Sequence, residues 1–252
     1  ILLPSGKIER SYPSFSPDGK ELAFIQDRRK LMVMNLDTKK VRQITDGSYW
    51  PSTGGGFEYQ WSPDGKWFAL CFTGNKHDPY YDIGIVSVQG GEITNLTNSG
   101  YSSGSPTWAM DGNAILFTSE RYGMRNHASW GSMEDVFLCF VNQDAYDKYR
   151  LSKEDYELLK EVEKEQEKLK KGDKKEDAKK DDKKDEKSSK DIVVELDGIQ
   201  DRIVRLTPNS SSLGSAIIDK KGETLYYTAS FEGGMDLWKL NLRKKDVKLA
   251  NK

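Results

Sequence analysis

A repeated hairpin sequence constrains the fold of this chain more than any other feature. The tetrapeptide Ser16-Pro17-Asp18-Gly19 returns as Ser62-Pro63-Asp64-Gly65, more loosely as Ala109-Met110-Asp111-Gly112, and in eroded form as Asp219-Lys220-Lys221-Gly222. Gly19 and Gly65 are 46 positions apart, and Gly65 and Gly112 are 47 positions apart. A repeat of this length is typical of propeller blades, whereas helical repeats are usually shorter.

Each repeat contains four short apolar or alternating runs that are separated by turn-forming residues. In the first repeat these runs cover residues 12–15, 21–25, 31–36 and 40–45, and such runs predict β-strands. Proline fixes φ, aspartate accepts local backbone hydrogen bonds and glycine adopts positive φ, so the tetrapeptide predicts a turn between the first two strands. Asp18, Asp64 and Asp111 are therefore interpreted as turn residues.

The fold class predicted from this pattern is all-β: a β-propeller with about four four-stranded blades in this chain, as part of a six- or seven-bladed ring. The innermost strands are expected at residues 12–15, 57–61, 106–109 and 213–218. The whole chain, residues 1–252, is interpreted as part of one propeller, with blades at residues 10–47, 48–99, 100–208 and 209–252. The connections between second and third strands are expected on one face of the disc, and the turns between first and second strands on the other.

The third blade contains an insertion at residues 143–202. Ser152 followed by Asp155 resembles a capping box and predicts a helix over about residues 152–170. Between Ser152 and Asp191 there are 14 Lys and 15 Asp or Glu residues, which predicts a solvated, charged linker up to residue 190. Residues 191–196 are interpreted as an extra strand that returns the chain to the blade.

The composition argues against several classes of protein. A net charge of −1 with 31% charged residues argues against a nucleic-acid-binding surface. No apolar run approaches about 18 residues and no charged-then-apolar leader opens the chain, so neither a membrane span nor a signal peptide is expected, and a mature secreted fragment stays open. Cys71 and Cys139 lie in apolar strand patterns and are predicted to be buried free thiols. The two histidines, His77 and His127, lack zinc-ligand spacing, and no metal or cofactor is expected.

The repeated hairpins, which close on an Ile/Leu-Thr pair, resemble the propeller repeats of TolB and of the tricorn-type proteases. The third repeat sharpens the similarity to bacterial tricorn homologues through the stretch Arg-Tyr-Gly-Met-Arg-Asn-His-Ala-Ser-Trp-Gly-Ser at residues 121–132. Further similar segments lie at residues 135–137, 142–146, 151–154 and 196–202. The resemblance implies a very large serine protease with stacked propellers, a PDZ-like module and a protease core, of which this chain matches only propeller.

The resemblance also implies a function, partners and a location. The chain is expected to be a non-catalytic module that guides or gates peptides, and the alternative is a TolB-like interaction scaffold with no protease attached. The expected partners are peptides or unfolded polypeptide, together with the remaining propeller, PDZ-like and protease domains of the parent chain. A homo-oligomer formed through the parent protein stays open. The implied location is periplasmic, with the cytoplasm as the alternative.

One pentapeptide matches a catalytic pattern. Gly100-Tyr101-Ser102-Ser103-Gly104 fits the sequence of a nucleophile elbow, but an elbow needs a strand before the serine and a helix after it. No helical pattern follows Ser102, so the pentapeptide is interpreted as a connection between blades and no catalytic residue is assigned.

Basic and aromatic residues in the connections between second and third strands are the candidates for substrate binding. Arginine binds carboxylates with two hydrogen bonds, and tryptophan offers a flat apolar contact, which together suit a peptide. The candidates are Arg28, Arg29, Arg121, Arg125, His127 and Trp130. Packing between blades or against a neighbouring domain is the alternative role for these side chains.

Overall fold

The computed structural model describes residues 8–48, 58–74, 80–125, 132–173, 191–231 and 233–250. Within these ranges the chain forms four antiparallel sheets, each built from four strands in chain order. The first sheet contains β1 (Arg10–Phe15), β2 (Glu21–Gln26), β3 (Lys30–Asn35) and β4 (Val41–Gln43). The second contains β5 (Tyr59–Trp61), β6 (Trp67–Phe72), β7 (Asp82–Ser87) and β8 (Thr94–Asn95). The third contains β9 (Ser103–Ala109), β10 (Ala114–Ser119), β11 (Asp135–Phe140) and β12 (Ile203–Arg205). The fourth contains β13 (Ser212–Ile218), β14 (Thr224–Ser230), β15 (Asp236–Asn241) and β16 (Asp246–Leu249).

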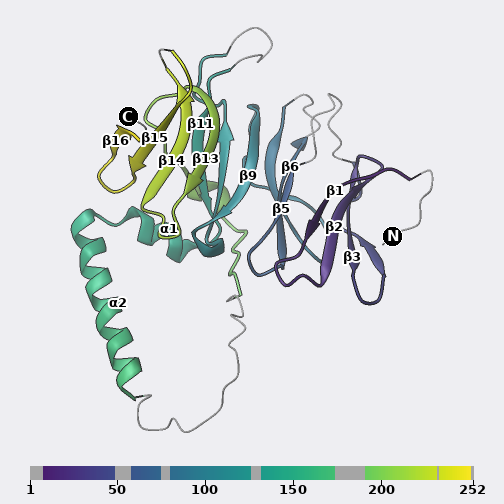
Figure 1. The fold of residues 1–252 in the computed structure, drawn as a ribbon, viewed down its shortest axis with the longest axis horizontal. Helices are drawn as coiled ribbons and strands as arrows, with labels where there is room; N and C mark the ends of the chain where they lie inside the picture. The colour runs from purple at the N-terminus through teal and green to yellow at the C-terminus, as the bar shows by residue number, and fades with distance from the viewer. Residues whose placement is uncertain are drawn as a thin grey trace.

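The sheets stand side by side as blades, from the N-terminal sheet at one end of the molecule to the C-terminal sheet at the other (Figure 1). Each junction between neighbouring sheets holds its own apolar core. Ile25 and Phe68 belong to the core between the first two sheets, Ile85 and Phe117 to the next core, and Leu138 and Tyr227 to the last. Successive side chains of a strand point to opposite faces, so an inner sheet can contribute to two cores. The predicted all-β partial propeller is confirmed.

The first strands of the first three blades lie innermost, where hydrogen bonds join one blade to the next. The Tyr59 hydroxyl donates to the carbonyl of Tyr12, and the Trp61 indole N–H donates to the carbonyl of Ser14 at 3.2 Å. Because the partners advance in step along both strands, β1 and β5 run parallel to each other. Both were predicted as innermost strands; residue 57, which the prediction included, lies outside the described residues.

The repeated tetrapeptide forms the predicted turn. Ser16 Oγ donates to Asp18 Oδ1 at 2.6 Å and accepts the N–H of Glu21 at 2.9 Å, while Asp18 accepts the N–H of Lys20 at 3.1 Å. Gly19 has a φ of 70°, which glycine adopts without a steric penalty. Local polar side chains and one glycine therefore determine this turn.

The second turn repeats these hydrogen bonds and makes one more, and the third turn has a different local structure. Ser62 and Asp64 repeat the bonds of the first turn, and Asp64 Oδ2 also accepts the N–H of Ile192 at 2.9 Å. Asp64 thus anchors the insertion in addition to forming a turn. Asp111 lies in a short 3-10 helix, η2 (Met110–Gly112), with a φ of 54°.

The threonine that closes a blade forms a hydrogen bond from the end of the last strand to the backbone of the third strand. Thr45 Oγ1 accepts the N–H of Leu31 at 3.0 Å, Thr97 Oγ1 that of Ile83 at 3.1 Å, and Thr207 Oγ1 that of Val136 at 3.2 Å. In the last two cases the hydroxyl also donates to a buried carboxylate, Asp82 or Asp135. The Ile/Leu-Thr pair therefore has a structural role: the apolar residue enters the core and the threonine satisfies a backbone donor.

The insertion of the third blade is mainly helical. It contains α1 (Gln143–Arg150), α2 (Lys153–Asp173) and the 3-10 helix η4 (Ile199–Arg202). Ser152 Oγ accepts the N–H of Asp155 at 3.1 Å and so caps α2, in the stretch where a helix was predicted. Helix α1 was not predicted from the sequence. Residues 191–196 form an irregular segment, whereas a strand was expected there. The rest of the predicted linker, residues 174–190, lies outside the described residues.

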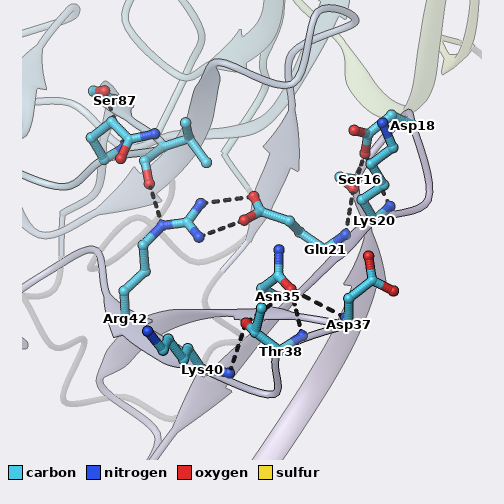
Figure 2. A network of polar contacts seen from close by, with 12 residues as sticks. Ser16, Asp18, Lys20, Glu21, Asn35, Asp37, Thr38, Lys40, Arg42 and Ser87 are labelled. Atoms are coloured by element: carbon cyan, nitrogen blue, oxygen red, sulfur yellow. Dashed lines mark hydrogen bonds and ion pairs between the residues drawn. The ribbon is translucent and has the colours of Figure 1, made fainter.

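A charged contact links the first two blades. Figure 2 shows the Arg42 guanidinium donating twice to the Glu21 carboxylate, at 2.5 and 2.7 Å. Arg42 Nε also donates to the carbonyl of Val88 in the second blade, at 3.1 Å. The side chains of Arg42 and Glu21 are 31% and 21% exposed, so this pair within the first blade contributes modestly to stability, and the bond to Val88 is the part that joins the two blades.

Three simpler expectations can be compared with the described part of the chain. Cys71 and Cys139 are free thiols, with Cys139 buried and Cys71 partly so. None of the described helices is long and apolar enough to cross a membrane. Among the described side chains, no group of three or more His, Cys, Asp or Glu is placed to hold a metal ion.

Candidate functional site

The innermost strands of the first three blades line a shared cavity of about 560 Å³. Its walls are residues 12–14, 58–60 and 105–107. Polar groups of one blade bind the backbone of the next: Glu58 Oε2 accepts the N–H of Ser105 at 2.8 Å, and Gln60 Oε1 accepts that of Trp108 at 2.6 Å. The cavity therefore has a polar, hydrogen-bonding wall at the centre of the fan of blades.

The predicted arginines lie at one end of the sheets. Arg28 and Arg29 lie in the turn between β2 and β3, and Arg121 and Arg125 lie in the connection between β10 and β11; all four are exposed. Both connections leave the second strand of their blade, so they belong to the same face. Helices α1 and α2 lie at the opposite end of the sheets (Figure 1).

Arg121 and Arg125 lie in the same connection and each contacts an aromatic ring; together with Tyr101, Tyr122 and Arg205 they are called the arginine cluster here. The Arg125 guanidinium lies 4.2 Å from the centre of the Tyr101 ring, and that of Arg121 lies 5.6 Å from the centre of the Tyr122 ring. Arg205 approaches the same Tyr122 ring at 5.1 Å. Such contacts hold a guanidinium in place by cation–π attraction while its N–H groups stay available.

The other predicted site residues are not part of this cluster. Arg28 and Arg29 belong to the first sheet, two blades away, although they share the face. His127 and Trp130 lie outside the described residues, so the structure does not place them.

Sequence reasoning missed Tyr101 and Arg205 as members of the cluster. Tyr101 lies in the passage from the second to the third blade, and Arg205 ends β12. In a blade of four antiparallel strands, the passage to the next blade lies on the same face as the connection between the second and third strands, so this geometry was the available signal. Only the tertiary structure brings these two side chains to the rings and guanidinium groups of the β10–β11 connection.

Ser102 is not presented on a nucleophile elbow. The residue that follows it begins strand β9 (Ser103–Ala109), where an elbow requires a helix. Its hydroxyl accepts the N–H of Tyr81 at 3.4 Å, and its own N–H donates to Glu120 at 3.1 Å. Residues 100–102 are a connection between blades, as expected, whereas Ser103 and Gly104 already belong to β9.

The two cysteines are poor candidates for chemistry. Burial raises the pKa of Cys71 and of Cys139 to about 12. Because the thiolate is the reactive form of cysteine, both side chains stay protonated and unreactive near neutral pH.

Two carboxylates face each other close to the arginine cluster. Ser119 pairs with Asp135 in the β10–β11 hairpin, so Glu120 and Glu134 are the next opposed positions. Glu120 is only 3% exposed. Burial raises the pKa of Glu134 above its usual range, and the nearby carboxylates of Glu120, Asp135 and Glu58 raise it further. The end of this hairpin therefore carries unfavourable negative charge when Glu134 is ionised.

Replacing Glu134 with glutamine is expected to stabilise the protein at neutral pH, by up to about 1 kcal/mol. A carboxyl group whose pKa is raised in the folded state lowers the stability of the protein as the pH rises from the unfolded pKa through the folded pKa. The gain should therefore disappear at pH 4 and below, where Glu134 is protonated in both states. Thermal unfolding of both proteins between pH 4 and pH 8 measures this difference. The exposed control Glu92→Gln should show no such trend, and equal pH profiles for Glu134→Gln and the wild type would contradict the assignment.

Comparison with known proteins supports the architecture. A family model described as the TolB beta propeller domain matches residues 11–126. A putative tricorn-like protease C-terminal subunit of Sulfurisphaera tokodaii is 28% identical over 117 residues, which is 46% of this chain and 13% of that protein. The peptidase YuxL of Bacillus subtilis is 30% identical over 113 residues, or 42% of this chain and 16% of that protein. The chain thus spans only a small part of the relatives it matches.

Solved structures give the same fold. The crystal structure of the tricorn protease superposes with a TM-score of 0.58 at 11% identity, covering 95% of this chain and 22% of that chain. The structure of a putative TolB from Agrobacterium tumefaciens gives a TM-score of 0.52 at 14% identity, covering 97% of this chain and 62% of that chain. Residues 11–126 thus match TolB-type propeller repeats, and the fold of the chain is that of a partial β-propeller, similar to the propellers of TolB and of the tricorn protease.

Proposed function

We propose that this chain is a non-catalytic propeller module of a tricorn-like serine protease, which guides or gates peptides and packs against the other domains of its parent protein. The observation that carries the proposal is the cavity that the innermost strands of three blades share, whose lining includes the polar residues Ser14, Ser105 and Thr107. A polypeptide in extended form needs such partners for its own N–H and C=O groups. The similarity to proteins named as tricorn-type proteases supports the parentage.

The proposal includes the organisation of the chain. Residues 1–252 form part of one propeller, with blades at residues 10–47, 48–99, 100–208 and 209–252, within a ring of six or seven blades. The parent protein lies in the periplasm, with the cytoplasm as the alternative. Its partners are peptides or unfolded polypeptide and the remaining propeller, PDZ-like and protease domains.

The proposed substrate-binding residues are Arg28, Arg29, Arg121, Arg125, His127 and Trp130. The exposed Arg121 and Arg125 carry most of the argument, because aromatic rings hold both guanidinium groups on the face to which the β10–β11 connection belongs. Carboxylates of an approaching peptide can accept their N–H groups, which are charge-assisted hydrogen bonds.

Replacing Arg121 and Arg125 together with alanine in the parent protease is expected to reduce cleavage of long acidic peptides by about tenfold or more. Each charge-assisted hydrogen bond is worth about 1.5–3 kcal/mol, and about 1.4 kcal/mol corresponds to a factor of ten. Cleavage of a minimal fluorogenic substrate should stay unchanged, because such a substrate needs no guidance. The measurement is the ratio of kcat/KM values for the two substrates. Arg150→Ala, at the exposed end of α1, is the control; equal loss, or no loss, on both substrates would remove the gating proposal.

A TolB-like interaction scaffold without a protease is the second candidate. The match of residues 11–126 to the TolB propeller model favours it. The coding sequence that follows residue 252 separates the candidates, because only the first predicts a PDZ-like module and a serine-protease core there.

A further inference from the structure

A second and larger cavity, a groove of about 960 Å³, lies at the end of the sheets that carries the inserted helices. The residues around it come from α1, α2, the segment at residues 191–195 and the first turns of the third and fourth blades. This is the end opposite the arginine cluster (Figure 1). The groove is therefore separate from the surface to which the peptide-guiding role was assigned.

Arg243 fixes the helical wall of this groove to the fourth blade. Its guanidinium donates to the carbonyls of Lys148, Tyr149 and Leu151, at 2.7, 2.5 and 2.8 Å, which lie at the C-terminal end of α1. These carbonyls have no partner within a helix and carry partial negative charge, so an arginine satisfies them well. The same guanidinium lies 4.0 Å from the centre of the Tyr156 ring on α2. Both helices are thus held against one blade.

The facing wall is the returning segment of the insertion. Ile192 donates its N–H to Asp64, and Glu195 donates its N–H to the carbonyl of Val141 at 2.8 Å. The Asn142 side chain donates to the carbonyl of Val193 at 3.3 Å. A methyl group added at Gly112 would lie 2.2 Å from Ile192 Cδ1, so the segment packs directly on the turn of the third blade. Both walls are consequently formed before any ligand binds.

Most charged side chains around the groove neutralise one another. Lys148 pairs with Glu163, Lys160 with Glu223, and Lys66 with Asp191. Five exposed charged groove residues have no ion-pair partner among the residues that the structure describes. They are the acids Asp111, Asp144 and Glu195 and the lysines Lys220 and Lys221. Glu195 Oε2 already accepts the N–H of Gln143 at 2.8 Å.

These unpaired charges differ in sign and in place. Asp111 belongs to the turn of the third blade and Asp144 to the first turn of α1, whereas Lys220 and Lys221 belong to the turn of the fourth blade. Apolar surface from Met110, Tyr149 and Ile192 lies in the same groove. A ligand that fits it carries an ammonium group, a carboxylate and an apolar body between them.

We infer that this groove binds a short peptide with both termini free. The peptide ammonium group pairs with Asp111 and Asp144, its carboxylate pairs with Lys220 and Lys221, and its side chains contact the apolar groove surface. The volume lies in the range of sites that enclose small ligands. This inference extends the proposed peptide-handling function to a second surface, at the other end of the blades.

The test uses the 252-residue chain and the pentapeptide Ala-Ala-Phe-Ala-Ala, with free termini or with acetylated and amidated ends, in titration calorimetry at low salt. The groove variants are Lys220→Gln/Lys221→Gln and Asp111→Asn/Asp144→Asn; asparagine tolerates the positive φ at residue 111. Lys244→Gln/Lys245→Gln, in the turn that follows β15, is the matched control because it removes the same charge outside the groove.

The expected result is binding of the free peptide by the wild type and the control, with about tenfold weaker binding or more for each groove variant and for the blocked peptide. Equal binding of free and blocked peptide would overturn the inference and would point to an internal segment of a partner protein. Absence of binding to the wild-type chain would also overturn it, while the gating proposal, which is tested on the parent protease, would stand. If only Arg121→Ala/Arg125→Ala loses binding, the peptide belongs to the other face and the groove inference falls.

Discussion

Replacing Asp135 with alanine is expected to lower the free energy of unfolding by about 3–5 kcal/mol, as is typical when one partner of a buried ion pair is removed. Asp135 is completely buried at the start of β11. Its carboxylate accepts the hydroxyls of Thr207 and Ser210, both at 2.7 Å, and Arg205 Nη2 at 2.9 Å. Alanine would leave the hydroxyls of Thr207 and Ser210 without this acceptor, while Arg205 Nη2 would keep only its bond to Ser210 Oγ at 3.2 Å. The Arg205 side chain is 33% exposed and can reach water, so the lower part of the range is expected.

Urea denaturation followed by tryptophan fluorescence measures this loss. Asp246→Ala provides the comparison, because Asp246 also pairs with a cation but its side chain and that of Lys248 are 46% and 71% exposed. An exposed ion pair contributes little, so Asp246→Ala should change the free energy of unfolding by less than about 1 kcal/mol. If Asp135→Ala lowered the free energy of unfolding no more than Asp246→Ala does, the buried network would not stabilise the blade.

Replacing Phe140 with alanine is expected to lower the free energy of unfolding by about 3–5 kcal/mol, the usual range for removing a buried aromatic ring. Phe140 has no exposed surface and belongs to the core between the third and fourth blades. Its ring also lies 5.7 Å from the Tyr146 ring and 5.0 Å from the Tyr149 ring, both on α1. The substitution therefore removes core packing and the aromatic contact that holds the inserted helix. Loss of blade stability should be accompanied by faster proteolysis of the insertion.

Equilibrium unfolding and limited proteolysis measure the two effects separately. Phe15→Ala is the matched control, since Phe15 is 62% exposed and should change the free energy of unfolding by no more than about 0.5 kcal/mol. If Phe140→Ala destabilised the chain without any change in proteolysis of the insertion, Arg243 and the other polar contacts of α1 would be sufficient to hold this helix. An equal decrease in the free energy of unfolding for Phe140→Ala and Phe15→Ala would contradict the burial that the structure assigns to Phe140.

Much of the fold could be predicted because its signals are local. The hairpin turns follow from Ser16, Asp18 and Gly19, which bond to one another within a few positions. The start of α2 follows from Ser152 and Asp155 for the same reason. Strand positions follow from short apolar runs repeated at blade spacing. Each of these elements depends on residues that are close in sequence, so the sequence alone sufficed for them.

The predictions that failed or were missing depended on distant residues. The segment at residues 191–196 contains the β-branched apolar run of a strand, but it packs on turns of the second and third blades and pairs with none of the described strands. Helix α1 is short, and its C-terminal carbonyls are satisfied by Arg243, more than 90 positions away in the chain. Such contacts leave no periodic pattern in the sequence.

Some features of the candidate site could likewise be predicted from the sequence, and others could not. The amino-acid sequence by itself determined that four repeats form four-stranded blades, and it assigned Arg28, Arg29, Arg121 and Arg125 to one face, because strand order and turn position are local properties. Only the tertiary structure decided which side chains meet: the guanidinium of Arg125 on the Tyr101 ring, the shared cavity between three blades, and the groove beside the inserted helices. The physical reason is that these features arise where blades pack against each other, and that packing depends on the shapes and charges of surfaces that are far apart along the chain.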